Sequence, residues 1–478
     1  MNAPDALPDV SRFLPRGLVA ELLVIVRSKG AEFAEVYGEH TLSTGFGLDE
    51  NRIKSSSWSI SQGVGVRAIH GEVTAYAYAD GFDPADLREA ARVAAQVANA
   101  AAANSAPVAF RAVDAKAPFT VERPVSLALD EARRVAMLQM ANDTARAHDP
   151  RVREVSASFG DAARSFIVAN SDGVWAEDRQ FVSRFGVNVL ALEGDNRHSG
   201  FAVAGGAVNP EHYLTERPPE RVAREAAVMA ITLLGAKEPE AGSYPVVIAP
   251  GWGGVLVHEC FGHSMEGDTI RKQTSIRATQ MGQQVAAKGV TIVDSGLVLW
   301  SRGSFRVDDE GTPAQRTVLV EDGILVGYMW DYLNAKLTGN RSTGNGRRAS
   351  YKHFPLCRMT NTYIEPGPHS PDALISEIKR GLYCKEMAGG SVSPADGNFS
   401  FQVTEAWQIE NGRLTHPVRN ATLTGNGNDA MLKIDGLGND LAINGSIGSC
   451  GKSGQWKAVG VGQPTVRFSG ITVGGTRT

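Results

Sequence analysis

Several features that define whole classes of protein are missing from this chain of 478 residues. No apolar run reaches the length of about 18 residues that a membrane-spanning helix needs, so we expect no membrane span. The formal net charge is only −4, which gives no bulk attraction to nucleic acid. The first residues lack the basic and apolar segments of a signal peptide. We therefore expect a cytoplasmic protein that binds neither membranes nor nucleic acid.

Cysteine is also scarce. The four cysteines are Cys260, Cys357, Cys384 and Cys450, and no two of them form a CxxC pair. This scatter argues against a zinc ribbon. In a cytosolic chain we expect free thiols rather than disulfides, and the usual role of such a thiol is that of a small buried side chain.

A nucleotide-binding loop is another missing feature, although one segment resembles it. Residues 448–453 read GSCGKS, but the P-loop pattern requires glycine at position 446, which is Ser446. Gly454 follows almost at once and argues against a helix after the loop. We therefore exclude a P-loop.

The patterns that are present predict an α+β fold with a mixed α/β N-terminal region and a β-rich C-terminal one. Helical periodicity predicts helices at 16–29, 84–103, 129–148 and 218–236, and extended patterns predict strands at 33–40, 55–68, 72–79, 152–170, 173–192 and 199–208. A polar, Pro- and Gly-containing segment at 237–242 is the natural boundary, which gives domains 1–237 and 238–478. An apolar strand at 244–249 leads into the second domain. Beyond residue 290, short punctuated strands and one helix at 371–384 predict an antiparallel, barrel-like body.

The most informative stretch is His258-Glu259-Cys260-Phe261-Gly262-His263. Zinc peptidases commonly carry H-E-x-x-H on a helix, where the two imidazoles share one face and the glutamate is the general base. Here the second histidine is one residue further on. At about 100° per residue, an undistorted helix would turn it roughly 140° away from the first. Gly262 allows the backbone to loosen or bulge at this point, which the spacing requires.

A catalytic zinc site takes three protein ligands, so the two histidines need a third. The candidates are Cys260 inside the motif, Cys450 far along the chain, and the nearby carboxylates of Glu266 and Asp268. Cys450 lies in a Gly- and Ser-rich segment whose backbone we expect to be exposed and flexible, and Lys452 would favour its thiolate. The residues alone leave Cys450 and the carboxylates open.

The chain resembles the TldD/PmbA family, and within it the zinc-bearing TldD branch. The matching stretches are HECFGHSMEGD at 258–268, the segments at 303–331 and 358–367, GSCGKSGQ at 448–455 and, in the N-terminal half, residues 63–80. The resemblance thus extends over nearly the whole chain.

This resemblance implies a cytoplasmic metallopeptidase that cleaves unfolded or short peptides. It implies a zinc ion (Zn²⁺) held by His258, His263 and Cys450, with Glu259 as the general base that activates a zinc-bound water. It also implies a dimer with an enclosed groove. The dimer is either a homodimer or a heterodimer with a PmbA/TldE-like subunit, in which this chain is the catalytic partner.

The substrate-binding residues are harder to place. A β-rich body could bind an extended peptide as an added strand. The segment 338–351 carries Arg341, Arg347 and Arg348, and is interpreted either as a mobile flap or substrate wall, or as a solvated surface. Two other functions remain open. One is a non-catalytic adaptor or scaffold with structural zinc, for which Glu266 could supply a fourth ligand, and the other is a cysteine hydrolase that uses Cys260 or Cys450.

Overall fold

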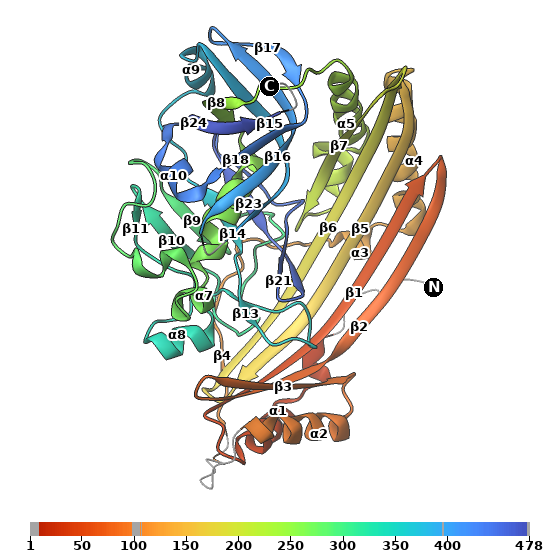
Figure 1. The fold of residues 1–478 in the computed structure, drawn as a ribbon. Coiled ribbons are helices and arrows are strands. Elements are labelled where there is room, and N and C mark those ends of the chain that lie inside the picture. The colour runs from red at the N-terminus through yellow and green to blue at the C-terminus, as the bar shows by residue number, and fades with distance from the viewer. Residues whose placement is uncertain (1–8, 98–105, 107, 394–395, 476–478) are drawn as a thin grey trace.

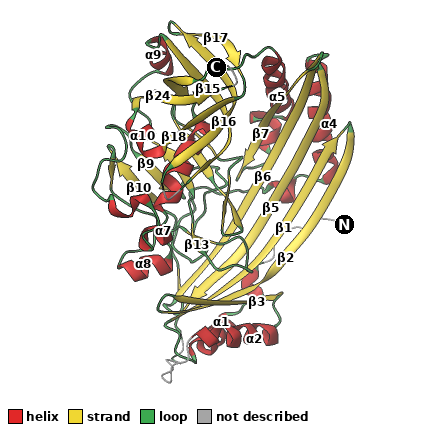
Figure 2. Cartoon of the chain, viewed as in Figure 1, coloured by secondary structure: helices red, strands yellow, loops and turns green. Residues whose placement is uncertain are grey.

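The N-terminal half is built on one long antiparallel sheet (Figures 1 and 2). The computed structural model describes residues 9–97, 106, 108–393 and 396–475. In this sheet the strand order is β3 (Val73–Asp80), β2 (Arg52–His70), β1 (Phe33–Asp49), β5 (Val152–Asn170), β6 (Val174–Glu193) and the short parallel β4 (Arg111–Ala112), with β7 (Asn196–Gly206) also paired to β6. The tight turn between β1 and β2 has positive φ at Glu50 (49°) and Asn51 (61°), as two-residue hairpins with primed turns require.

Helices cover this sheet near both ends of its long strands. At one end α1 (Arg16–Arg27) and α2 (Pro84–Ala94) pack on β1 to β3, and at the other α4 (Glu131–His148) and α5 (Pro219–Leu234) pack on β5 to β7. Each pair of helices buries its own apolar cluster against the sheet, because each helix presents small and branched apolar residues on one face.

The C-terminal half contains a closed five-stranded barrel. Its strands are, in order, β15 (Arg380–Val392), β8 (Gly242–Ile248), β24 (Val466–Gly474), β18 (Ala421–Asn426) and β16 (Asn398–Glu410), and β16 pairs back to β15. Outside the closed ring, β17 (Arg413–Val418) pairs with β16 and β19 (Ile434–Leu437) with β24. The α+β prediction with a barrel-like C-terminal region is confirmed.

A second sheet lies beside the barrel. Its order is β11 (Ile324–Leu325), β10 (Arg316–Glu321), β9 (Ile292–Ser295), β14 (Asn361–Ile364), β23 (Gly460–Gln463) and β20 (Ala442–Asn444). Two hairpin-like ladders, β12 (Gly346–Arg347) with β13 (Leu356–Cys357) and β21 (Ser449–Lys452) with β22 (Gln455–Ala458), stand apart from both sheets. The short helices here are α7 (Gly267–Arg271), α8 (Tyr332–Thr338), α9 (Pro371–Ser376) and α10 (Gly427–Leu432).

Three of the sequence-based element predictions need correction. The helix expected at 371–384 ends at Ser376, and the chain enters strand β15 at Arg380 because this segment closes the barrel between β8 and β16. The strand expected at 33–40 continues to Asp49. Of the helix expected at 84–103, α2 ends at Ala94 and a 3₁₀ turn follows, while residues 98–103 lie outside the described residues.

Buried ion pairs join the long sheet to the C-terminal loops. Arg67 on β2 contacts Glu310 at 2.5 Å, and Glu35 on β1 accepts from Arg348. Arg164 on β5 contacts Asp309. The two sides of each contact are more than a hundred residues apart in sequence, and all of these side chains are buried.

The division into domains 1–237 and 238–478 remains a prediction. The helices among the described residues are too short or too polar to cross a bilayer.

Candidate metal centre

The histidine motif lies on a short, buried, irregular helix that leaves the barrel at the end of β8. A 3₁₀ turn at Gly251–Gly254 and one α-turn at Val255–Val257 lead into it. Val255, Leu256 and Val257 are buried in the C-terminal core, which fixes this helix against the barrel. The peptide groups of the motif therefore lie in a packed environment rather than on a mobile loop.

The unusual spacing of the two histidines is resolved by a π-helical turn over His258–Gly262. The backbone N–H of His263 donates to the carbonyl oxygen of His258, five residues earlier. A π-turn accommodates one residue more than an α-turn, so residues i and i+5 come to lie one above the other. The two imidazole rings accordingly lie next to each other in an edge-to-face arrangement, with centroids 5.3 Å apart and ring planes 83° apart. The predicted local departure from an α-helix is confirmed.

Gly262 is needed here for a different reason from the one the sequence indicated. Its φ of −53° and ψ of −58° are ordinary helical values, so no special backbone freedom is used. Instead, a Cβ atom at this position would lie 1.8 Å from the sulfur of Met359. Glycine permits the close approach of the 359 segment to the motif.

Cys450 reaches the motif from the β21–β22 hairpin. Ser453 and Gly454 form its turn, both with positive φ (49° and 75°). The neighbours Ser449 and Gly451 are exposed, whereas Cys450 itself is 5% exposed and paired in register with Lys457. The hairpin also confirms that the GKS sequence is not followed by a helix.

His258, His263 and Cys450 converge on one point. One ligand atom from each lies within 4.8 Å of the others, and Cys450 Sγ is 3.3 Å from His263 Nε2. His258 Nδ1 is buried and has no hydrogen-bond partner among the described residues. Two imidazoles and a thiolate are ligands that zinc binds in tetrahedral sites with three protein ligands. The donor set and its geometry fit such an ion.

The electrostatics of the three side chains favour the thiolate. Burial alone would raise the pKa of Cys450, but hydrogen bonds and charge from His258 and His263 outweigh it and lower this pKa to about 5. Burial would lower the pKa of His263, yet the charge of Glu266 and the contact with Cys450 raise it well above its usual value. Burial raises the pKa of Cys260, which packs against Gly427 and keeps its proton. All four cysteines are buried free thiols, as predicted.

Glu266 supports His263 from the side away from Cys450. Its Oε2 lies 3.3 Å from His263 Nδ1 and accepts a hydrogen bond from Lys452 Nζ at 2.8 Å. Lys452 Nζ also donates to Asp268 at 2.7 Å. Burial would raise the pKa of Glu266, but the charges of Lys452 and His263 lower it to about 2. Both carboxylates that competed for the third ligand position therefore have other partners.

Two residues that support the Cys450 hairpin, Lys452 and Arg358, do not belong to any sequence motif that would predict this role. Lys452 was noted only as a neighbour of Cys450, and its bonds to Glu266 and Asp268 link the hairpin to the motif. Arg358 was not identified at all. It is buried and donates to the carbonyl oxygens of Cys450 (2.6 Å) and Gln455 (3.1 Å), one on each strand of the hairpin. The residues next to Arg358 in sequence do not predict that it donates to two carbonyl oxygens far along the chain.

Glu259 is more open than its neighbours. Its side chain is 25% exposed, and its Oε2 lies 3.9 Å from His263 Nε2, on the side of the ring that faces Cys450. A carboxylate in this position borders the convergence point without being enclosed by a fixed partner.

The three arginines of segment 338–351 lie in different environments. Arg341 is exposed, whereas Arg348 is fully buried and bound to Glu35 of the long sheet. Arg347 is 4% exposed and donates to the carbonyl oxygens of Met359 and Ala458. Residues 344–348 are buried and pack between the long sheet and the Cys450 hairpin, so this part of the segment is not a solvated surface.

Comparison with known proteins places the whole arrangement in a family. Three family models match in order: PmbA/TldA metallopeptidase domain 1 at residues 34–98, the central domain at 124–234 and the C-terminal domain at 241–475. The chain is 39% identical to the Metalloprotease TldD homolog of Haemophilus influenzae over 95% of both chains. It is 35% identical to a metalloprotease of Methanothermobacter thermautotrophicus over 68% of this chain and 70% of that one.

Solved structures share the fold at lower sequence identity. The crystal structure of TldE from Thermococcus kodakarensis superposes with a TM-score of 0.77 at 19% identity, covering 96% of this chain and 100% of that one. A protein of Thermotoga maritima, described as a proposed modulator of a DNA gyrase, gives a TM-score of 0.79 at 22% identity over 96% of this chain and 99% of that one. These two likenesses concern the fold alone.

Proposed function

Because this chain belongs to the PmbA/TldD metallopeptidase family, we propose that it is a zinc-dependent peptidase that hydrolyses unfolded or short peptides. The observation that carries the proposal is the convergence of His258, His263 and Cys450 within 4.8 Å. Curated relatives along the full length of the chain are named metalloproteases, which supports the same reading.

The proposed ligands of zinc are His258 Nδ1 or Nε2, His263 Nε2 and Cys450 Sγ. A zinc ion held by these three side chains would supply a Lewis acid that makes water easier to deprotonate near neutral pH. His263 is held for this task by Glu266, which fixes the ring orientation through Nδ1. The Cys450 strand is held in place by Arg358, which donates to the Cys450 carbonyl oxygen, and by the bond from Lys452 to Glu266.

Glu259 is the proposed general base. It accepts the proton of the attacking water and then delivers a proton to the leaving amine. Its partial exposure and its place beside His263 Nε2 support this role, since a base must reach both the water and the substrate. Glu266 is unsuited to it, because it is buried and already bound to His263 and Lys452.

Two rival functions make different demands on the same residues. A scaffold with structural zinc needs a fourth protein ligand, and the engagement of Glu266 with His263 and Lys452 weighs against it. A cysteine hydrolase would use the short Cys450–His263 contact and the lowered pKa of Cys450 as a nucleophile and base. A chelator abolishes cleavage by the zinc enzyme but leaves a cysteine enzyme active, and thiol alkylation has the reverse effect.

We further propose that the protein acts in the cytoplasm as a dimer. Its partner is either a second copy or a TldE-like subunit, in line with the TldE fold of one structural neighbour. Co-purification followed by measurement of the molar mass in solution separates the two arrangements.

The decisive experiment measures bound zinc and peptide cleavage together, for wild type and Cys450→Ser. We expect one zinc per chain in wild type, and loss of both zinc and cleavage in the variant. The matched control is Cys260→Ser, a second buried thiol that lies between the two histidines and should retain zinc. If Cys450→Ser retained zinc, the third ligand would have to be another residue. Cleavage by zinc-free protein would overturn the proposal.

A further inference from the structure

A cavity of about 360 Å³ lies against the hairpin that carries Cys450. Residues of β22 form one wall, and residues of β1, β2, β5 and β6 of the long sheet form another. Lys457, on the wall formed by β22, is paired in register with Cys450 on β21. The Cα atoms of such paired residues on neighbouring antiparallel strands lie about 4.5–5.5 Å apart. The cavity is therefore one strand away from the candidate metal ligand.

The charge of the cavity wall is strongly one-sided. Four cationic side chains and a single carboxylate, Glu39, line it; the cations are Arg164, Arg302, Arg347 and Lys457. Two of the four are neutralised, since Arg164 contacts Glu39 and Asp309, and Lys457 contacts Asp309 at 3.2 Å.

The other two cations have no carboxylate partner among the described residues. Arg347 is buried and bonds only to backbone carbonyl oxygens, at 2.6 and 2.8 Å. Arg302 donates to the carbonyl oxygen of Ser446 at 2.9 Å, and its Nε is buried without any partner. A guanidinium carries five N–H donors, so both groups retain unused ones. Burying a cation without an anion is costly, which indicates that an anionic group completes this cavity when it is occupied.

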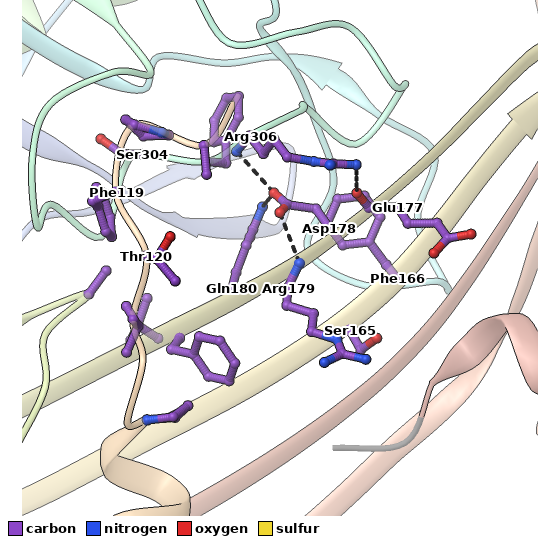
Figure 3. A pocket seen from close by; sticks show the side chains of 18 of the residues that line it. Phe119, Thr120, Ser165, Phe166, Glu177, Asp178, Arg179, Gln180, Ser304 and Arg306 are labelled. Carbon is purple, nitrogen blue, oxygen red and sulfur yellow. Dashed lines mark hydrogen bonds between the residues drawn. The ribbon is translucent and has the colours of Figure 1, made fainter. Parts of the chain in front are cut away.

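A second, larger cavity continues from the first along the sheet. It measures about 590 Å³ and shares Gln180, Val182 and Arg302 with the smaller one. Figure 3 shows its wall, where Asp178 is fully engaged by the backbone N–H groups of Arg306 and Arg179 and by Gln180. Phe119 and Phe166 give this cavity an apolar surface. The two cavities together offer a basic end and a longer path with a mixed polar and apolar lining.

We propose that the cavity lined by Arg302 and Arg347 binds a carboxylate of the peptide substrate and so anchors the chain beside the metal centre. This inference rests on the proposed peptidase function. Bidentate guanidinium–carboxylate pairing supplies the recognition, and the volume suits the end of a peptide rather than a folded protein. The carboxylate can come from the C-terminus of the peptide or from an acidic side chain, and the test separates the two sources.

Binding is measured by calorimetry on the full-length chain after zinc removal, so the result does not depend on turnover. The probes are an N-acetylated alanine pentapeptide with a free C-terminus, its C-terminal amide, and the amide with aspartate at the central position. We expect the free acid to bind about 10- to 100-fold more tightly than the plain amide. Tighter binding of the aspartate peptide alone would assign the site to an acidic side chain.

The variants Arg302→Met and Arg347→Met should abolish the preference for the acid. An apolar replacement of a buried charge is often tolerated, and thermal unfolding verifies that each variant is folded. The control is Arg184→Gln, which removes an exposed positive charge near Arg302 that does not line the cavity. It should keep the preference.

Equal affinity for the acid and both amides, or no binding of the acid at all, would overturn the inference. If a variant fails to fold, the comparison of the three peptides on wild type still decides. Cleavage by the zinc-loaded chain is measured separately on the amide. Zinc-dependent cleavage without a carboxylate preference would reject only the anchor, whereas a preference without any cleavage would reject only the peptidase function.

Discussion

Glu259 and Glu266 lie seven residues apart and have opposite surroundings. Glu259 is 25% exposed beside Nε2 of His263, whereas Glu266 is buried against Nδ1 of the same ring and bound to Lys452. One carboxylate is reached by solvent, and the other is held between the His263 ring and Lys452. Replacing either glutamate by glutamine should therefore have a different effect at each position.

Replacing Glu259 by glutamine should leave zinc bound and reduce the rate of cleavage by about 10²- to 10⁴-fold, which is the usual contribution of a general base. The matched change Glu266→Gln should instead weaken zinc binding by about 10- to 100-fold, because it removes the acceptor for His263. Metal content after dialysis and cleavage rate at saturating zinc distinguish the two. A Glu259→Gln enzyme as active as wild type would show that the base is another group.

The sequence identifies the residues of the site unequally, for a physical reason. His258, Glu259 and His263 form a local pattern whose chemistry can be stated from spacing alone. Cys450 is nearly two hundred residues away, and only a resemblance to a family connects it with the motif. Lys452 and Arg358 act through a carboxylate or carbonyl oxygens brought near by the fold, so nothing adjacent in sequence marks them.

Among the structural elements, the π-turn at His258–Gly262 decides whether the two histidines can share a metal. The motif alone predicts a distortion, because five α-helical steps separate the rings. It does not reveal that Met359 packs onto Gly262 from a distant segment. The turn is held partly by its own hydrogen bond and partly by this packing.

Gly262→Ala should therefore cost about 1–3 kcal/mol of stability and weaken zinc binding, because the new methyl group must displace Met359 or unwind the turn. The double change Gly262→Ala with Met359→Ala should recover part of the zinc affinity. Gly17→Ala is the control, since Gly17 lies in α1 with open space around it and alanine favours a helix. An unchanged zinc affinity in Gly262→Ala would show that the turn tolerates the contact.

Strand β15 shows why the barrel could be expected but its elements could not all be located. Short punctuated strands predict a β-rich body, yet the helix predicted at 371–384 includes the first residues of β15, 380–384. Their strand conformation follows from pairing with β8 in parallel and β16 in antiparallel register, and both pairings join distant parts of the chain. The long hairpins of the N-terminal sheet were predicted more closely, since successive strands pair and their alternation is local.

One pair across β15 and β16 predicts a dependence of stability on pH. Glu386 lies opposite Glu405, and burial together with that negative charge raises the pKa of Glu386 to about 7. In the unfolded chain a glutamate has a pKa of about 4.3. Between these two values the unfolded state has lost its proton while the folded state keeps it, so the free energy of unfolding falls as the pH rises through this window.

Glu386→Gln removes this penalty. Relative to wild type, the variant should gain roughly 1–3 kcal/mol at pH 8 and little at pH 4.5, as measured by urea unfolding at both pH values. Glu321→Gln on β10 is the control, because this exposed side chain should change stability by less than about 0.5 kcal/mol at either pH. An equal effect of Glu386→Gln at the two pH values would contradict the argument.

On the scale of the whole molecule, the long sheet and the C-terminal loops are joined by buried charges as well as by apolar contacts. The acidic run Asp308, Asp309 and Glu310 lies between the arginines of the sheet and the Cys450 hairpin. Asp309 alone contacts Arg164 on the sheet and Lys457 on the hairpin. The sheet therefore reaches the Cys450 hairpin through one carboxylate.

Arg348 makes the most enclosed of these contacts. Its guanidinium binds Glu35, donates to the carbonyl oxygen of Asp309 at 2.8 Å, and lies 4.1 Å from the centroid of the Tyr37 ring. Arg67 is also near Glu35, at 4.0 Å, but it is engaged by Glu310. Loss of Arg348 would thus leave the buried carboxylate of Glu35 with Arg67 alone, which Glu310 already engages at 2.5 Å.

Arg348→Met should reduce the free energy of unfolding by about 3 kcal/mol or more, since removing one partner of a buried pair strands the other charge. Adding Glu35→Gln should recover much of this loss, because a neutral amide no longer needs the cation. Arg341→Met, an exposed change in the same segment, should alter stability by less than about 0.5 kcal/mol. Urea unfolding of wild type, Arg348→Met, Glu35→Gln and the double variant measures the cycle, and Arg341→Met is measured beside it. If the double variant is no more stable than Arg348→Met alone, the contact across the molecule is sustained by shape and apolar packing rather than by this pair of charges.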